Sequence, residues 1–177
     1  MTKNITQNLN INMNWIHLND FQKNIDLSFF NHDKYKNDIQ SLDKKMSDIL
    51  CDDSWMGNCA KYQLNSGGKR FRAILALLAS KIFGLSKQVS HDIAICCEFI
   101  HNASLIHDDL QDRDLLRRGL PTIWNRFGDH TAINLGDLFI SASFETITKI
   151  NTNPELKCLA INELSKTIKQ TLKGQSI

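Results

Sequence analysis

Apolar side chains recur at helical spacing, three or four residues apart, along most of this 177-residue chain. That period predicts amphipathic α-helices. No stretch alternates apolar and polar residues as a half-buried strand does. We expect helices over residues 20–50 with a break at 31–33, and over 54–63, 69–83, 87–112, 129–150 and 154–172. The pattern predicts an all-α fold, with a loose leader at residues 1–19 and one partial helical domain at residues 20–177.

Some helix boundaries can be read from single residues. The stretch 69–83 is apolar almost all round, which is typical of a helix buried in a bundle. Gly84 follows it and is suited to end it. Asn153 and Pro154 fit the N-cap and the first position of the last helix. Residues 114–125, with one glycine and one proline, are expected to form an irregular connection.

Composition excludes several classes of protein. The 21 basic and 19 acidic residues leave a formal net charge of +2, and no clustered basic excess suggests a nucleic-acid-binding surface. No apolar run approaches the ~18 residues of a membrane-spanning helix, and the start of the chain lacks the apolar core of a secretory signal. The five cysteines form no CxxC pair, so we expect free thiols in a cytoplasmic protein.

The strongest chemical signal is an acidic run followed by an arginine pair. Asp108 and Asp112 are four residues apart, so a helix places them on one face, with Asp109 beside them. Mg²⁺ prefers carboxylate oxygens together with substrate phosphates, and Arg117 and Arg118 would supply fixed positive charge for a diphosphate. The alternative is a solvated helix end with loosely paired charges. The strongly apolar helix that leads into this run argues against that alternative.

Two further features suggest an anion site. His101 lies seven residues before Asp108, so it falls on the same helical face, although a lone helical histidine is more often structural. The segment 67–72 reads GGKRFR, in which two glycines allow a backbone to approach a phosphate and the cations stand at a helix start. Alone, this second feature is a weak signal.

Together these segments resemble a known family, the trans-polyprenyl diphosphate synthases. The resemblance covers roughly residues 54–175 and rests on four ordered segments, GGKRFRA, EFIHNASLIHDDLQDRDLLRRGLPTIW, AINLGDLFISASFE and LKGQ. It is best with the geranylgeranyl and longer-chain type, because the DDxxD motif lacks the two-residue insertion of many short-chain enzymes. One departure is Ala73, where the family's GGKRxRP pattern has proline.

The resemblance implies an isoprenoid-synthase-type helical bundle that condenses an allylic diphosphate with isopentenyl diphosphate, with Mg²⁺ as cofactor. It implies contacts with isopentenyl diphosphate for Lys69, Arg72, His101 and Arg118, Mg²⁺ ligation by Asp108 and Asp112 with support from Asp109, and an allylic-diphosphate site at Arg117 and near Gln175. The small Ala103 and Ser104, five and four positions before the first aspartate, imply space for a product of C20 or longer.

The resemblance also implies that part of the enzyme lies beyond this sequence. The family has a lysine element and a second aspartate-rich motif downstream of GQ, so we expect a bundle that is incomplete at its C-terminal side. A homodimer or a partner synthase subunit is the expected assembly. Two alternatives remain at this point: a non-catalytic subunit of a heteromeric synthase, and an HD-type metal phosphohydrolase using His91, His101, the pair His107 and Asp108, and a later aspartate.

Overall fold

The computed structural model describes residues 32–175. The expected leader 1–19 and the expected helical residues 20–31 therefore lie outside the described residues. The helices discussed below belong to one compact unit that begins at Tyr35. The elements are η2 (His32–Tyr35), α2 (Lys36–Leu50), α3 (Trp55–Asn65), α4 (Phe71–Ile82), α5 (Lys87–Gln111), β1 (Leu116–Arg117), β2 (Leu120–Pro121), α6 (Ile123–Phe127), α7 (Asp129–Lys149) and α8 (Pro154–Gln175).

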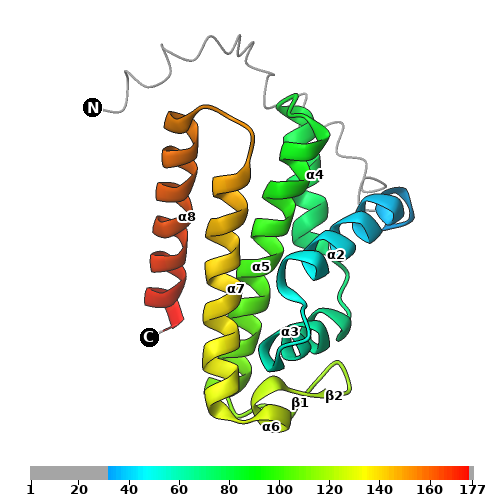
Figure 1. Ribbon diagram of the computed structural model, residues 1–177, viewed down its shortest axis with the longest axis vertical. Coiled ribbons are helices and arrows are strands. Elements are labelled where there is room, and N and C mark those ends of the chain that lie inside the picture. The colour runs from blue at the N-terminus through cyan, green and yellow to red at the C-terminus, as the bar shows by residue number, and fades with distance from the viewer. Residues whose placement is uncertain (1–31, 176–177) are drawn as a thin grey trace. The chain divides into compact units, whose positions relative to one another are not determined.

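The all-α prediction is confirmed, and α5 and α7 form the centre of the bundle. Figure 1 shows them running side by side in opposite directions, with α4 against α5 and α8 against α7. Phe99 of α5 and Phe139 of α7 are fully buried and meet edge to face with ring centroids 5.7 Å apart. Burial of such a side chain contributes about 1.5–3 kcal/mol. Gly136 lets the two helices approach closely, because a Cβ there would collide with the His107 ring.

Two helix boundaries follow the sequence signals. Gly84 has a φ of +67°, and the Leu85 amide donates to the Ser80 carbonyl at 2.9 Å, which is the geometry of a glycine-terminated helix end. At the start of α8, the Leu156 amide donates to Asn153 Oδ1 at 2.8 Å. Both predicted boundaries are confirmed.

The irregular connection predicted at 114–125 is more ordered than expected. It contains an antiparallel hairpin, in which Leu116 pairs with Pro121 and Arg117 with Leu120, and then the short helix α6. Arg118 and Gly119 form the turn with φ values of +54° and +79°, which matches a type I′ hairpin. Strands of two residues are too short to show alternation in a sequence, so the expectation of no strand was wrong here.

The helix α4 differs from its prediction in two ways. It begins at Phe71 instead of Lys69, because Arg70 adopts a left-handed conformation with φ of 47°. One side of it is also exposed, although we expected burial all round. Its outward side chains include Phe71 and Ile82, and Phe83 just beyond it is 72% exposed. The apolar pattern was correct, but the described residues cover only the side of α4 that faces the core.

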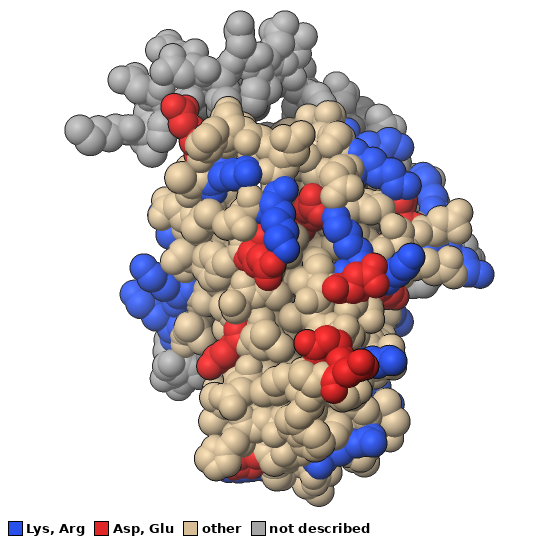
Figure 2. All heavy atoms as spheres, viewed as in Figure 1, with Lys and Arg blue, Asp and Glu red and all other residues tan. Residues whose placement is uncertain are grey.

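The surface in Figure 2 mixes lysine and arginine with aspartate and glutamate across the visible face, with neutral side chains between them. None of the helices in the described part of the chain is both long enough and apolar enough to cross a membrane.

Candidate functional site

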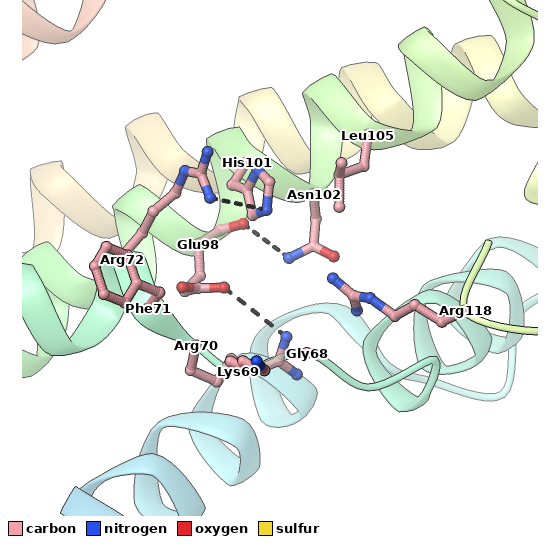
Figure 3. A pocket seen from close by; sticks show the side chains of 10 residues that line it. All are labelled: Gly68, Lys69, Arg70, Phe71, Arg72, Glu98, His101, Asn102, Leu105 and Arg118. Carbon is pink, nitrogen blue, oxygen red and sulfur yellow. Dashed lines mark hydrogen bonds and ion pairs between the residues drawn. The ribbon is translucent and has the colours of Figure 1, made fainter. Parts of the chain in front are cut away.

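A polar cavity of about 530 Å³ opens between the start of α4, the middle of α5 and the hairpin. Figure 3 shows Arg72 reaching it from α4, His101 and Asn102 from α5, and Arg118 from the hairpin turn. Its lining is Gly68, Lys69, Arg70, Phe71, Arg72, Glu98, His101, Asn102, Leu105 and Arg118. Three segments that are far apart in the sequence thus bring a lysine and several arginines to one cavity.

The two glycines fit closely around Arg118. Its guanidinium donates to the Gly67 carbonyl, and a Cβ at position 68 would come within 2.9 Å of Arg118 Nη1. Gly68 also has a φ of +141°, which side-chain-bearing residues rarely adopt. The glycine pair therefore does more than admit a ligand: it lets an arginine from the hairpin lie against the loop before α4.

His101 and Arg72 form a direct pair on the wall of this cavity. Arg72 Nη1 lies 3.2 Å from His101 Nε2. A guanidinium only donates, so this nitrogen must accept and the ring must be neutral. Burial, followed by the nearby guanidinium groups of Arg72 and Arg118, lowers the pKa of His101 to about 4. At neutral pH, the histidine acts here as an acceptor that holds an arginine in place.

A buried polar layer lies beneath the cavity. Arg70 Nε donates to Asp43 Oδ1 at 2.7 Å, and Arg70 Nη2 donates to the Leu64 carbonyl at 3.1 Å. Its Nη1 also lies 3.8 Å from Glu98 Oε2. Glu98 in turn accepts from the Ala73 amide at 3.0 Å. Arg70 is thus engaged with Asp43, the Leu64 carbonyl and Glu98.

The acidic end of α5 lies near the hairpin. Asp109 is 2% exposed, and its Oδ1 and Oδ2 accept from Arg117 Nε at 2.7 and 2.9 Å. Asp108 and Asp112 are more exposed than Asp109. Burial raises the pKa of Asp108, and the negative charge of Asp112 raises it further. The two carboxylates predicted to share a face therefore repel each other, while their neighbour is neutralised by Arg117.

These carboxylates fit Mg²⁺ in donor type, since a hard cation takes oxygen ligands and would relieve the repulsion. Across residues 32–175, however, no group of three or more histidine, cysteine, aspartate or glutamate side chains is arranged to hold a metal. Asp108 and Asp112 would therefore hold the ion only together with ligands from outside the described residues, such as substrate phosphates or water.

The loop that carries the arginine pair is held by its own contacts. Arg113, which has a φ of 57°, donates to both carboxylate oxygens of Asp129 at 3.0 and 2.9 Å and lies 5.0 Å from the centre of the Trp124 ring. The Asp114 carbonyl accepts from the Thr122 hydroxyl at 2.7 Å and from Trp124 Nε1 at 2.8 Å. The hairpin thus presents Arg117 and Arg118 from a fixed frame.

A second, smaller cavity of about 30 Å³ lies between α5, α7 and α8. It is lined by Ile100, Ala103, Ser104, His107, Ile140, Ile168, Thr171 and Leu172. Ala103 and Ser104, singled out in the sequence, both face it.

The sequence and the fold of this chain match known proteins. The family pattern described as polyprenyl synthetase matches residues 53–177. The chain belongs to the polyprenyl synthetase family. A geranylgeranyl diphosphate synthase of Methanosarcina mazei is 33% identical over 147 residues, covering 81% of this chain and 45% of that protein. A short chain isoprenyl diphosphate synthase of Methanocaldococcus jannaschii is 33% identical, covering 80% of this chain and 43% of that one.

Solved structures of similar proteins have the same fold over the matched part of the chain. The geranylgeranyl pyrophosphate synthetase of Pyrococcus horikoshii superimposes with a TM-score of 0.76 at 29% identity, covering 84% of this chain and 46% of that structure. The corresponding enzyme of Geoglobus acetivorans gives a TM-score of 0.72, also at 29% identity, over 79% of this chain and 46% of that structure. This polyprenyl synthetase chain therefore spans somewhat less than half the length of these relatives.

The residues predicted from the sequence fall into separate groups. Lys69, Arg72, His101 and Arg118 line the large cavity together. Asp109, beside the other two aspartates, pairs with Arg117. Gln175 is the last residue of α8, and its side chain lies outside the described residues. The roles assigned to these residues remain predictions.

The family match argues against the phosphohydrolase alternative, and so does the placement of its histidines. His91 lies 3.1 Å from Asp38 of α2, whereas His101 contacts Arg72 and His107 packs over Gly136. The three histidines of α5 thus have three different environments.

The sequence reasoning missed Glu98, Asn102 and the structural role of Arg70. A signal did exist, because Glu98 precedes His101 by three residues and so shares its helical face. A glutamate in an otherwise apolar helix needs a partner. Its partners, Ala73 and Arg70, are more than 24 residues away, and spacing along one helix cannot reveal them.

Proposed function

We propose that this chain supplies the isopentenyl diphosphate pocket and the first metal-binding carboxylates of a prenyltransferase that condenses isopentenyl diphosphate with an allylic diphosphate. The observation that carries the proposal is the cavity of about 530 Å³ on which Lys69, Arg72 and Arg118 converge. Such a concentration of cations around one opening is costly unless an anion binds between them.

The side chains in this pocket would divide the work of binding. Arg118 and Arg72 offer planar donor forks suited to phosphate oxygens, and Lys69 adds a mobile point charge. His101, now an acceptor for Arg72, would release it towards the ligand. The diphosphate would thus be held at one end of the pocket, with Leu105 beside it as an apolar neighbour for the isopentenyl carbons.

The allylic diphosphate would bind at the acidic end of α5. Asp108 and Asp112 would hold Mg²⁺, which when bound supplies positive charge to the departing diphosphate. Arg117, oriented by the buried Asp109, would contact the same diphosphate from the hairpin. The residues of this chain thus bind and orient, and their positive charge favours cleavage of the allylic carbon–oxygen bond.

The small side chains below the aspartates support a long product. Because Ala103 and Ser104 place no bulky group on the turn of α5 before Asp108, we propose a product of C20 or longer. In an assembled enzyme, the change Ala103→Phe should shorten the product, and a C15 product from the unaltered enzyme would contradict the assignment.

Completion by further polypeptide is part of the proposal. The chain spans 45% of a synthase relative, and the outer side of α4 exposes Phe71, Leu75 and Ile82. We propose that further helices complete the catalytic centre, within a homodimer or together with a partner synthase subunit. A second candidate function rests on the same observation: the chain could serve as a non-catalytic subunit that binds diphosphates beside an active synthase.

Calorimetry with isopentenyl diphosphate tests the pocket directly. Charge removal in Arg118→Ala or Lys69→Ala should weaken binding at least about tenfold. Lys81→Ala is the matched control, because Lys81 lies in the last turn of the same α4 helix. Equal affinity in all four proteins would contradict the proposal.

The two candidate functions differ in turnover. A synthase reconstituted with the proposed further helices should lose condensation when Asp108 is replaced by alanine. A non-catalytic subunit should leave the turnover of its partner unchanged by the same substitution.

A further inference from the structure

A buried carboxylate lines the cavity that we propose for an anion. Glu98 belongs to the lining, yet its side chain is only 3% exposed. A negative charge here repels a diphosphate, so its presence needs another physical reason.

The reason lies at the start of α4. The first amides of a helix have no partner inside it. The N-cap residue, Arg70, is left-handed and makes no side-chain capping bond in the described structure. Glu98 supplies the cap from another helix, since its Oε1 accepts from the Ala73 amide at 3.0 Å. The other carboxylate oxygen lies 3.8 Å from Arg70 Nη1.

Glu98 therefore acts on both sides of one turn. It holds the first turn of α4, which carries Arg72, and it faces the guanidinium of Arg70, whose backbone adopts a φ of 47°. A left-handed non-glycine residue persists only where its surroundings hold it. Lys69 directly precedes Arg70 and Arg72 follows it by two residues, so the position of both depends on this turn.

The pKa of Glu98 lies above its ordinary value. Burial raises this pKa, and the Ala73 amide and the guanidinium of Arg70 offset only part of the rise. Figure 3 shows its carboxylate directed towards Arg70, below the side chains of Arg72 and His101.

We propose that Glu98 is a positioning residue of the anion pocket: its carboxylate fixes the turn at residues 67–72 so that Lys69 and Arg72 face the diphosphate, and its negative charge limits the affinity for that diphosphate. This inference rests on the proposed function, namely that the pocket binds a diphosphate. Two substitutions can measure the fixing of the turn and the effect of the charge separately. Glu98→Gln keeps an oxygen that can accept from Ala73 but removes the charge, whereas Glu98→Ala removes both.

The test combines binding with hydrogen exchange on the full chain. Titration with inorganic pyrophosphate in the absence of Mg²⁺ should give roughly tenfold tighter binding for Glu98→Gln and weaker binding, by about threefold or more, for Glu98→Ala. Deuterium uptake in residues 69–77 should be faster in Glu98→Ala and unchanged in Glu98→Gln. The change Glu145→Gln, on the exposed side of α7, is the control for loss of an acidic charge.

Each outcome decides a different point. If both substitutions weaken pyrophosphate binding equally, the charge effect is wrong and Glu98 is only structural. If Glu98→Ala leaves deuterium uptake unchanged, the positioning role is wrong. If the unaltered chain does not bind pyrophosphate at all, the proposed function of the pocket and the affinity effect both fail, while hydrogen exchange still decides whether Glu98 holds the turn.

Discussion

The cationic pocket and the acidic end of α5 are built in opposite ways. In the pocket, each arginine is held by a protein acceptor. His101 accepts from Arg72, the Gly67 carbonyl accepts from Arg118, and Asp43 accepts from Arg70. At the acidic end, burial and the neighbouring Asp112 raise the pKa of Asp108. The pocket is thus arranged in advance by the protein, whereas the carboxylates repel each other until a cation joins them. The first region should tolerate the absence of its ligand better than the second.

The largest expected effect follows from removing the repelling carboxylates. Asp108→Ala or Asp112→Ala should each lower the Mg²⁺-dependent affinity for a non-ionisable allylic diphosphate analogue about a hundredfold or more, since Mg²⁺ would lose one of two carboxylate ligands. Calorimetry measures this loss.

The control for that experiment is the other region. Binding of pyrophosphate without Mg²⁺ should stay unchanged in both variants, because it depends on the cationic pocket. If both variants retain Mg²⁺-dependent affinity for the analogue, the carboxylates are only a charged helix end.

The next effect separates Asp109 from its neighbours. Asp109 is buried and paired with Arg117, so Asp109→Ala should lower the free energy of unfolding by about 2 kcal/mol. Urea unfolding is the measurement. The matched control is Asp112→Ala, which removes a repelling charge from the same motif and should leave stability equal or higher. Equal losses in the two variants would contradict the contrast.

These contrasts also show how far the sequence could lead. The helical period reveals helices α2 to α5, α7 and α8, and the DDxxD and GGKR patterns reveal the two charged regions. Helical spacing places Asp109 on the buried face of α5, three residues after Ile106, but the sequence does not reveal the hairpin that folds back onto it and supplies Arg117. Likewise, the capping of α4 by Glu98 joins two helices, and helical spacing describes only one helix at a time.

Gly68 tests whether the pocket is arranged in advance. Gly68→Ala would place a Cβ within 2.9 Å of Arg118 Nη1 at a φ of +141°. The side chain of Arg118 can move, but the backbone strain stays, so the free energy of unfolding should fall by about 1 kcal/mol.

Pyrophosphate affinity should fall with it, because Arg118 must leave its position. Gly174→Ala is the control, as its added Cβ would meet no atom within 4 Å. Full affinity in Gly68→Ala would show that Arg118 need not lie against the glycine pair.

The smallest expected effect is a pH dependence that belongs to the pocket alone. Because the folded pKa of His101 is about 4, below the ordinary histidine pKa of about 6.5, the unfolded chain binds more protons than the folded chain between these values. The contribution of His101 to stability is therefore complete above about pH 6.5 and is lost as the pH falls towards 4. The glutamine in His101→Gln can still accept from Arg72 but does not titrate, so it should flatten the stability profile in this window. Since the ring is only half-buried, screening by water keeps the difference small. Urea unfolding of both proteins at pH 7 and pH 4.5 measures this difference in stability. A larger loss of stability in the glutamine variant on acidification would mean that another group near Arg72 takes up the proton.

A bound diphosphate should oppose the loss of stability at low pH, because its negative charge offsets the arginines that now keep His101 neutral. The gain in stability from pyrophosphate should therefore be greater at pH 4.5 than at pH 7 in the unaltered chain, by more than in His101→Gln, in which only the protonation of the ligand itself can change.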